Sequence, residues 1–234
     1  MLKIEHLTKK YKDKVAVSNL SLEVRPGEIC GFIGHNGAGK STTLKCVCGI
    51  LAYEEGEISI FGKNVRADSL EAKQITAYLP DNPDLYEFLP AIKYLNLIAD
   101  IFGVPEDLRN ERISRYADML ELTPNLAELI SSYSHGMKQK LAIISALLHE
   151  PRLFVLDEPF VGLDPKAAFS VKQILRDFTN RGGAVIFSSH VLEVVEKLCD
   201  TVAIISRGRL VAFGDTEKVK GDASLEEVFL EINK

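Results

Sequence analysis

The stretch from Gly34 to Ser41 constrains the fold of this chain more than any other part of its sequence. It reads Gly-His-Asn-Gly-Ala-Gly-Lys-Ser and matches the pattern G-x-x-x-x-G-K-[ST]. The apolar run 29–33 before it indicates a buried strand, and residues 41–48 indicate a helix that ends at Gly49. In this context the glycines let the backbone turn its N–H groups inward, at a helix N-terminus that attracts phosphate. The sequence therefore predicts a nucleotide site.

This loop supplies the first candidate binding residues. Lys40 is expected to reach the β- and γ-phosphates, and the Ser41 hydroxyl can ligate Mg²⁺. A glycine-rich turn that matches the pattern by chance is the alternative, and the flanking strand and helix argue against it. The other residues expected to surround the phosphates of ATP are Gly34, His35, Asn36, Gly37, Ala38, Gly39 and Thr42.

Composition and charge limit the classes of protein that fit this chain. It has 234 residues, of which 46% are hydrophobic and 26% charged, so it can bury a core. Its 28 Lys and Arg against 33 Asp and Glu give a net charge of -5, which argues against nucleic acid as the main partner. The lysines between residues 3 and 14 are expected to form a solvated surface.

Membrane spans and disulfides are not expected. The longest apolar run, residues 141–148, is far shorter than the ~20 residues that cross a bilayer, and no N-terminal signal pattern is evident. The four cysteines lack the usual zinc spacings, so we expect reduced, buried thiols in the cytosol. A cytoplasmic protein is predicted, and any place at a membrane would come through a partner.

The order of the strand and helix patterns predicts an α/β fold in a single domain, residues 1–234. Alternating apolar residues indicate an N-terminal antiparallel β region, with Tyr11 in a polar loop between two runs. Helical spacing then gives way to alternating strands and helices, a closing hairpin around Arg207-Gly208, and an amphipathic tail helix. We therefore expect a P-loop NTPase core with an inserted all-helical lobe. The core would comprise residues 1–83 and 151–234, and the lobe about 84–150.

Two acidic residues follow the apolar strand at 153–156. Parallel strands place ligands at their carboxyl ends, so Asp157 and Glu158 are expected to emerge beside the phosphate loop. Asp157 is placed to hold Mg²⁺, and Glu158 to orient or deprotonate the attacking water. An acidic helix cap is the alternative. His190, after the next strand, can reach a γ-phosphate, although such a histidine taken alone is more often structural.

Over essentially its whole length the chain resembles the ATP-binding cassette family, the nucleotide-binding subunits of ABC transporters. Residues 133–139, Tyr-Ser-His-Gly-Met-Lys-Gln, stand where the family has its Leu-Ser-Gly-Gly-Gln signature. Gly162-Leu163-Asp164 matches the D-loop of the family, and His190 matches its switch histidine. The resemblance also identifies Tyr11 as the aromatic residue that stacks on adenine, backed by Val17.

The resemblance implies a Mg²⁺-dependent ATPase that dimerises head to tail, either with itself or with a related cassette. Two ATP molecules would lie between the phosphate loop of one subunit and the signature of the other. It also implies an integral membrane permease on a separate chain, with this subunit at the inner face of the membrane. Ser134 would serve equally as a helix N-cap. The residues expected to act on the partner's ATP are Ser134, His135, Gly136 and Met137, with Asp164 in the D-loop.

Three residues depart from the family pattern, and they help to decide which type of cassette this chain is. His135 and Met137 replace a glycine and the glutamine of the signature, as in some exporter-type cassettes. Asp81 stands where the family usually has a glutamine, and its carboxylate can still reach Mg²⁺ or the water. We expect an exporter-type subunit that powers a permease. The alternative is a non-transport cassette of translation or DNA repair, whose members usually carry two cassettes, coiled-coil arms or zinc inserts. A regulatory cassette without activity is disfavoured by the complete catalytic set.

Overall fold

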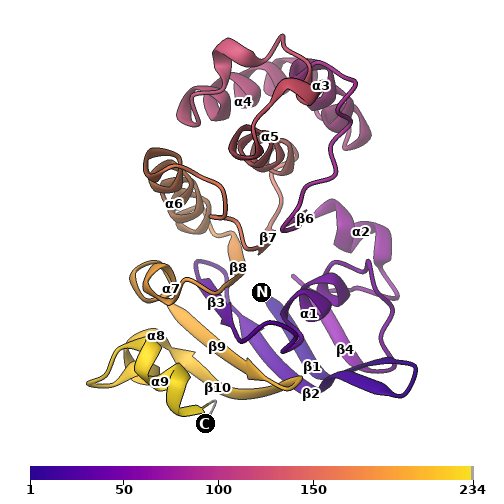
Figure 1. Ribbon diagram of the computed structural model, residues 1–234. Helices are drawn as coiled ribbons and strands as arrows, with labels where there is room; N and C mark the ends of the chain where they lie inside the picture. Colours follow the sequence, from indigo (N-terminus) through magenta and orange to yellow (C-terminus); the bar gives the residue numbers. More distant parts are fainter. Residues whose placement is uncertain (233–234) are drawn as a thin grey trace.

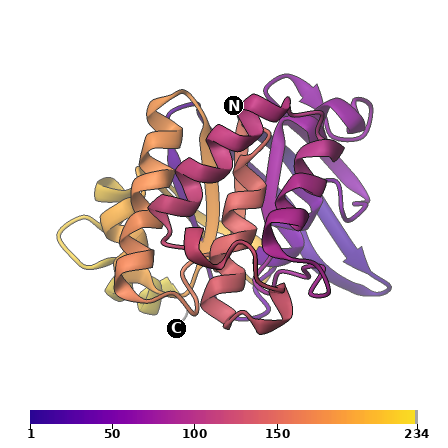
Figure 2. The same ribbon diagram turned by 90° about the horizontal axis from the view of Figure 1, so that it is seen from above.

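Two β-sheets and a helical lobe make up the computed structural model, which describes residues 1–232 (Figure 1). Figure 2 shows the same arrangement from above, with the lobe helices lying over the sheets. Across these 232 residues, no helix has both the length and the apolar composition needed to cross a bilayer.

The N-terminal sheet has four strands in the order β2-β1-β4-β5, all paired antiparallel. This confirms the expected N-terminal antiparallel β region, but the position predicted for Tyr11 is wrong. Tyr11 is the last residue of β1, paired with Lys14 of β2, because the strand pattern continues up to a tight turn in which Lys12 has φ 52°. The strands are β1 (Leu2–Tyr11), β2 (Lys14–Val24), β4 (Glu55–Ile60) and β5 (Lys63–Asn64).

The second sheet has six strands in the order β10-β9-β3-β8-β7-β6 and carries the phosphate loop. All its neighbours pair parallel except β10 with β9. Strands β3, β7 and β8 are buried at every residue, which explains their unbroken apolar runs. The strands are β3 (Ile29–Ile33), β6 (Thr76–Leu79), β7 (Leu153–Asp157), β8 (Ala184–Ser189), β9 (Thr201–Ser206) and β10 (Arg209–Asp215).

The helices of the core follow the expected order, with two additions that the sequence patterns did not indicate, α2 and α8. Both are short, six and five residues, so they show little helical periodicity. The predicted tail helix is present as α9 and buries Leu225. The core helices are α1 (Lys40–Val47), α2 (Ser69–Gln74), α6 (Pro165–Asn180), α7 (Leu192–Leu198), α8 (Thr216–Lys220) and α9 (Leu225–Ile232).

The lobe contains three helices and two 3₁₀ turns and stands above the six-stranded sheet in Figure 1. Pro90 is the N-cap of its first helix, where a missing N–H costs no hydrogen bond. The helices are α3 (Ala91–Ile101), α4 (Glu106–Met119) and α5 (His135–Leu147), and the turns are Thr123–Asn125 and Ile130–Ser132. The grouping of lobe and core into one domain stays a prediction.

The hydrophobic core forms two clusters, one on each face of the six-stranded sheet. Alternate residues of β7 face opposite sides, so Phe154 joins the cluster that includes the lobe and Val155 joins the cluster shared with the N-terminal sheet. All four cysteines are free and buried, as expected, and burial raises the pKa of the Cys30 thiol to about 12. The sheet is therefore held from both faces, which fixes the loops at its carboxyl edge.

Candidate nucleotide-binding site

The phosphate loop joins β3 to α1 in a conformation that requires glycine at two positions. Gly39 has φ 109°, and a Cβ built on it would lie 2.6 Å from the carbonyl oxygen of Ala16. A Cβ on Gly34 would lie 2.5 Å from the carbonyl oxygen of Ile205. Any larger residue would push the loop away from the strands beneath it. The loop is therefore held open as a cradle of backbone groups in front of α1.

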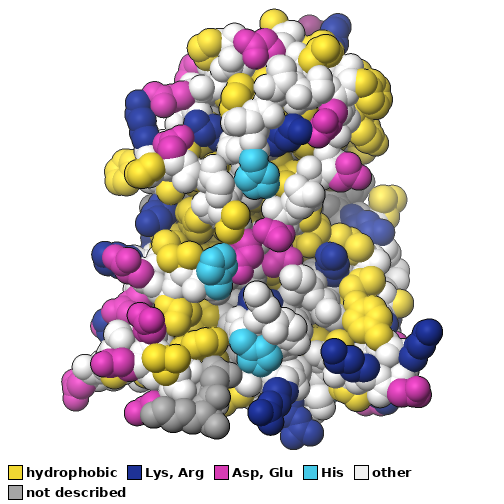
Figure 3. Space-filling model, viewed as in Figure 1, with side chains coloured by type: hydrophobic (Ala, Val, Ile, Leu, Met, Phe, Trp, Pro, Cys, Tyr) yellow, Lys and Arg dark blue, Asp and Glu magenta, His cyan; other side chains and the backbone are white. Residues whose placement is uncertain are grey.

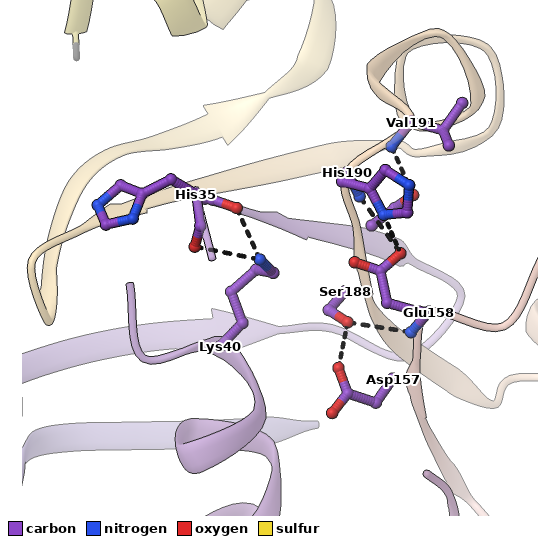
Figure 4. Close-up of polar contacts among 9 residues, drawn as sticks. His35, Lys40, Asp157, Glu158, Ser188, His190 and Val191 are labelled. Carbon is purple, nitrogen blue, oxygen red and sulfur yellow. Dashed lines mark hydrogen bonds and ion pairs between the residues drawn. The ribbon is translucent and has the colours of Figure 1, made fainter. Parts of the chain in front are cut away.

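Lys40, the first residue of α1, lies largely buried against this loop. Its ammonium group donates hydrogen bonds to the carbonyl oxygens of Gly34 (2.6 Å) and His35 (3.4 Å), as Figure 4 shows. Burial lowers the pKa of Lys40, while the nearby carboxylates of Glu158 and Asp157 act to raise it. The lysine thus faces both the loop and the acidic pair, where the charge of a polyphosphate would fall.

The acidic pair lies at the carboxyl end of β7, as predicted, and is fixed by a residue that the sequence analysis did not single out. Ser188 of β8 is directly opposite Asp157 in the sheet register. Its hydroxyl donates a hydrogen bond to Asp157 Oδ1, and its oxygen accepts one from the Glu158 backbone N–H at 3.1 Å (Figure 4). Asp157 is 4% exposed. In the sequence, the signal for this role of Ser188 was its position as a polar residue at the end of an apolar strand.

His190 meets Glu158 at the edge of the site. The His190 ring atom Nδ1 lies 2.9 Å from Glu158 Oε2, and the His190 backbone N–H donates to the same oxygen at 3.3 Å (Figure 4). Glu158 itself has φ 52°, a conformation that a non-glycine residue adopts only when its surroundings hold it there. On the face of the molecule shown in Figure 3, acidic and histidine side chains gather between lobe and core.

A cleft of about 550 Å³ joins Lys40 to Asp157 and Glu158, whereas His190 and Gly34 line a neighbouring hollow. Val17 is fully buried and does not line it, whereas Lys14, Val15, Ala16, Arg207 and Gly208, none of them predicted, do. The Arg207-Gly208 hairpin reaches the cleft because the Gly208 N–H donates to Ala38 O at 2.8 Å. The backing of the base by Val17 stays a prediction. The predicted residues that line the cleft are Tyr11, His35, Asn36, Gly37, Gly39, Lys40, Ser41, Thr42, Asp81, Asp157 and Glu158.

The donor set of the cleft suits a magnesium nucleotide. The hydroxyl of Ser41 and the carboxylates of Asp157 and Asp81 all line the cleft, and oxygen ligands of this kind are those that Mg²⁺ takes in proteins. Backbone N–H groups at the start of α1 and the Lys40 ammonium supply the positive charge that phosphates need. The site therefore fits ATP with Mg²⁺.

The signature residues lie on the lobe, at the start of α5. Ser134 is the N-cap, and its oxygen accepts a hydrogen bond from the Met137 N–H at 3.3 Å. His135 and Gly136 pack against Gly162, where a Cβ on Gly136 would lie 2.7 Å from the Gly162 carbonyl oxygen. None of the residues 134–137 lines the cleft as the structure describes it.

The D-loop aspartate is likewise a helix cap. Asp164 accepts a hydrogen bond from the Ala167 N–H at 2.9 Å at the start of α6. That bond, with Lys140 nearby, lowers the pKa of the Asp164 carboxyl. The roles predicted for the signature and for Asp164 on a second subunit's ATP stay predictions.

Comparison with known proteins identifies the family to which this chain belongs. The profile of the family described as ABC transporter matches residues 17–161. The chain belongs to the ABC transporter ATP-binding family. It is 32% identical to the ABC-type transporter ATP-binding protein EcsA of Bacillus subtilis, over 100% of this chain and 97% of that protein. It is 33% identical to the linearmycin resistance ATP-binding protein LnrL of Bacillus subtilis, over 92% of this chain and 69% of that one. A solved structure of an ATP-binding subunit of an ABC transporter matches with a TM-score of 0.96 at 33% identity, covering 100% of both chains.

Membership in the ABC family confirms the predicted fold and activity. The chain is an ATP-binding subunit of an ABC transporter, and it hydrolyses ATP with Mg²⁺. ABC ATP-binding subunits form dimers and work with membrane permeases. No comparison supports the alternative of a non-transport cassette.

Proposed function

We propose that this ABC subunit closes head to tail on a second cassette, with ATP held between the phosphate loop of one and the signature of the other. The position of the signature is the observation that carries the proposal. Ser134 and Gly136 start a helix whose free N–H groups form an anion-binding end, yet they lie outside the cleft of their own chain. A second subunit brings such an end to the phosphates that the first subunit holds.

Hydrolysis in the closed site follows from the geometry around Glu158. Glu158 takes the proton of the attacking water or orients it, and His190 is positioned by the same carboxylate to reach the γ-phosphate. Lys40 offsets the negative charge that builds on the phosphates. Ser41, Asp157 and Asp81 would hold Mg²⁺, which would supply Lewis-acid polarisation of the phosphate oxygens.

The partner is an integral membrane permease on a separate chain, and the direction of transport is export. The resistance function in the name of LnrL and the replacements at His135 and Met137 support export. A probable multidrug ABC transporter ATP-binding protein of Escherichia coli, YbhF, is also 30% identical over 99% of this chain, which spans 41% of YbhF. The subunit would lie at the inner face of the membrane through its permease.

A trapped dimer tests the head-to-tail arrangement. Glu158→Gln should lower ATP turnover by about 10²–10⁴, the usual worth of a general base, while leaving the phosphate loop intact. The ATP-bound dimer of this variant should then appear in size-exclusion chromatography only when ATP is present. Adding Ser134→Arg should abolish the dimer without changing the affinity of the monomer for ATP. A dimer that survives Ser134→Arg, or that forms without ATP, contradicts the arrangement.

Co-purification tests the permease. The tagged Glu158→Gln chain, extracted with mild detergent from membranes of its own cells, should bring down a multi-span protein. The double variant with Ser134→Arg is the matched control for assembly of the two cassettes. Recovery of the tagged chain with ribosomes or DNA-repair proteins and without a membrane protein would favour the non-transport alternative.

A further inference from the structure

A second cavity, of about 440 Å³, lies between lobe and core at the opposite end of the six-stranded sheet from the nucleotide cleft. It is lined by Arg152, which precedes β7, and by Gly183, which precedes β8. The nucleotide cleft takes Asp157 from the other end of β7. We propose that this second cavity, the seam cavity, is a binding site for an organic anion with an apolar body.

The apolar walls come from both parts of the molecule. Tyr116 of α4 and Leu147 of α5 belong to the lobe, whereas Phe178 belongs to α6 of the core. Each of the three side chains is at most 6% exposed, so the walls are fixed by packing around them. A volume of this size falls within the roughly 300–1,000 Å³ typical of small-molecule sites, which are mostly apolar with a few polar groups.

The charged residues that line the seam cavity are Arg152, Arg181 and Glu150. Among residues 1–232, neither Arg152 nor Arg181 forms an ion pair with a carboxylate, and both are exposed. The Arg152 guanidinium lies over the Phe61 ring, 4.0 Å from its centroid, which leaves its charge without a carboxylate partner. The single acidic residue in the lining, Glu150, is already paired with Arg112 at 2.6 Å. The lining therefore carries an excess positive charge, and guanidinium groups bind carboxylate, sulfonate or phosphate through paired N–H donors.

The position of the seam cavity connects it to the nucleotide site through three elements. Helices α5 and α6 lie next to each other in both ribbon views (Figures 1 and 2). Helix α5 begins after Ser134 and ends at Leu147, and α6 begins after Asp164 and ends beside Arg181. A ligand in the cavity would thus touch α5, α6 and the residue before β7, at the ends of these elements remote from their site residues, and would hold lobe against core.

Titration with 1-anilinonaphthalene-8-sulfonate tests the site, because this probe has an aromatic body and one sulfonate. The wild-type chain, without nucleotide, should bind it saturably. Arg152→Ala with Arg181→Ala should weaken its binding by at least about tenfold, through the loss of two charge-assisted donors. Binding of N-phenyl-1-naphthylamine, the same ring system without the sulfonate, should change by less than about twofold.

Arg209→Ala is the matched control variant. Arg209 lies beside apolar residues in a different hollow, with Val211 and Phe229, and its removal should leave the sulfonate titration unchanged. If circular dichroism shows that the double variant has lost its fold, Arg181→Ala alone serves, because Arg181 is an exposed helix C-cap. Equal loss of both probes, no loss in the arginine variants, or loss in Arg209→Ala each overturns the proposal.

Discussion

At the scale of single residues, the site combines buried, hydrogen-bonded groups with one exposed aromatic ring. Ser188 locks Asp157 and the backbone of Glu158 in place at the carboxyl edge of the sheet. Tyr11, in contrast, is 46% exposed at the end of β1, with the Lys9 ammonium 5.2 Å from its ring centroid. Phosphate binding is therefore built into the core, whereas the base would meet an exposed surface at the periphery of the cleft.

This difference predicts weak discrimination between bases. Stacking on an aromatic ring contributes about 1–3 kcal/mol and tolerates any base. We expect GTP to be hydrolysed within roughly tenfold of ATP, about 1.4 kcal/mol. Tyr11→Ala should weaken both nucleotides alike, and Tyr11→Phe should be nearly silent because it keeps the ring. Affinities of the three proteins for ATP and GTP measure this, and strong ATP selectivity or an indifferent Tyr11→Ala would show that another group holds the base.

At the scale of elements, two chain segments join the lobe to the core and can carry changes between them. One runs from β6 through Asp81 into the lobe, and the other runs from α5 through His149 into β7. Asp81 lines the nucleotide cleft, and the His149 ring stacks on Phe102 with centroids 3.8 Å apart. The first junction thus lies beside the nucleotide site, and the second packs against the end of α3.

The Asp81 junction is expected to pass the nucleotide state to the lobe. Asp81 is exposed and lies two residues after the end of β6, so its loss should disturb the site more than the fold. Asp81→Ala should lower ATPase activity more in the presence of the permease than in the isolated subunit. Asp81→Gln, which keeps an oxygen and similar reach, should retain more activity than alanine. Equal loss in both variants, or none in either, would leave Asp81 without this role.

The His149 junction should make stability depend on pH. Burial lowers the pKa of His149 to about 4, from an ordinary value of 6.5. The imidazole therefore binds a proton more readily in the unfolded chain than in the folded one. The stability that the neutral, buried His149 contributes is fully present above pH 6.5 and is lost as the pH falls toward 4. The loss amounts to about 2 kcal/mol at pH 5.

His149→Phe isolates that contribution, since it keeps a ring against Phe102 and removes the titrating group. Urea unfolding of the wild type and the variant at pH 7.5, 6 and 5 gives the difference in free energy of unfolding. The wild type should lose about 2 kcal/mol relative to the variant between pH 7.5 and 5. A difference that stays constant with pH would mean that folding does not lower the pKa of His149.

At the scale of the whole molecule, one hydrophobic cluster crosses the boundary between lobe and core. Tyr94 and Leu141 of the lobe belong to the same cluster as Phe154 and Phe187 of the sheet. A hydrophobic cluster shared by lobe and core predicts that the two unfold together. Because of this shared packing, a conformational change at either junction is transmitted to the sheet that carries the acidic pair.

Cooperative unfolding can be followed with probes that the chain already contains. The four cysteines are all buried in the core, so their reaction with a thiol reagent reports on the core. Far-UV circular dichroism reports on the helices, including all those of the lobe. The two urea transitions should coincide at pH 7.5. If the helix signal is lost at a lower urea concentration than the protection of the thiols, the lobe unfolds by itself.

Local sequence was sufficient for the parts of the site that depend on neighbouring residues. The phosphate loop needs glycine for its turns and a lysine at the helix start, and these lie within eight consecutive positions. The acidic pair follows a short apolar strand, and the lobe helices show their own periodicity. Such features are encoded by spacing along the chain, so the phosphate loop, the acidic pair and the lobe helices could be located from sequence.

Tertiary structure alone decided which distant residues meet. The register of β7 with β8 brings Ser188 to Asp157, and the β9–β10 hairpin brings Arg207 to the cleft. Packing also placed Tyr11 in a strand, buried Val17, and set Arg152 and Arg181 on one cavity. These contacts join segments far apart in sequence, and no local periodicity specifies them. They are fixed by how two sheets and a lobe bury their apolar faces together, which is a property of the whole chain.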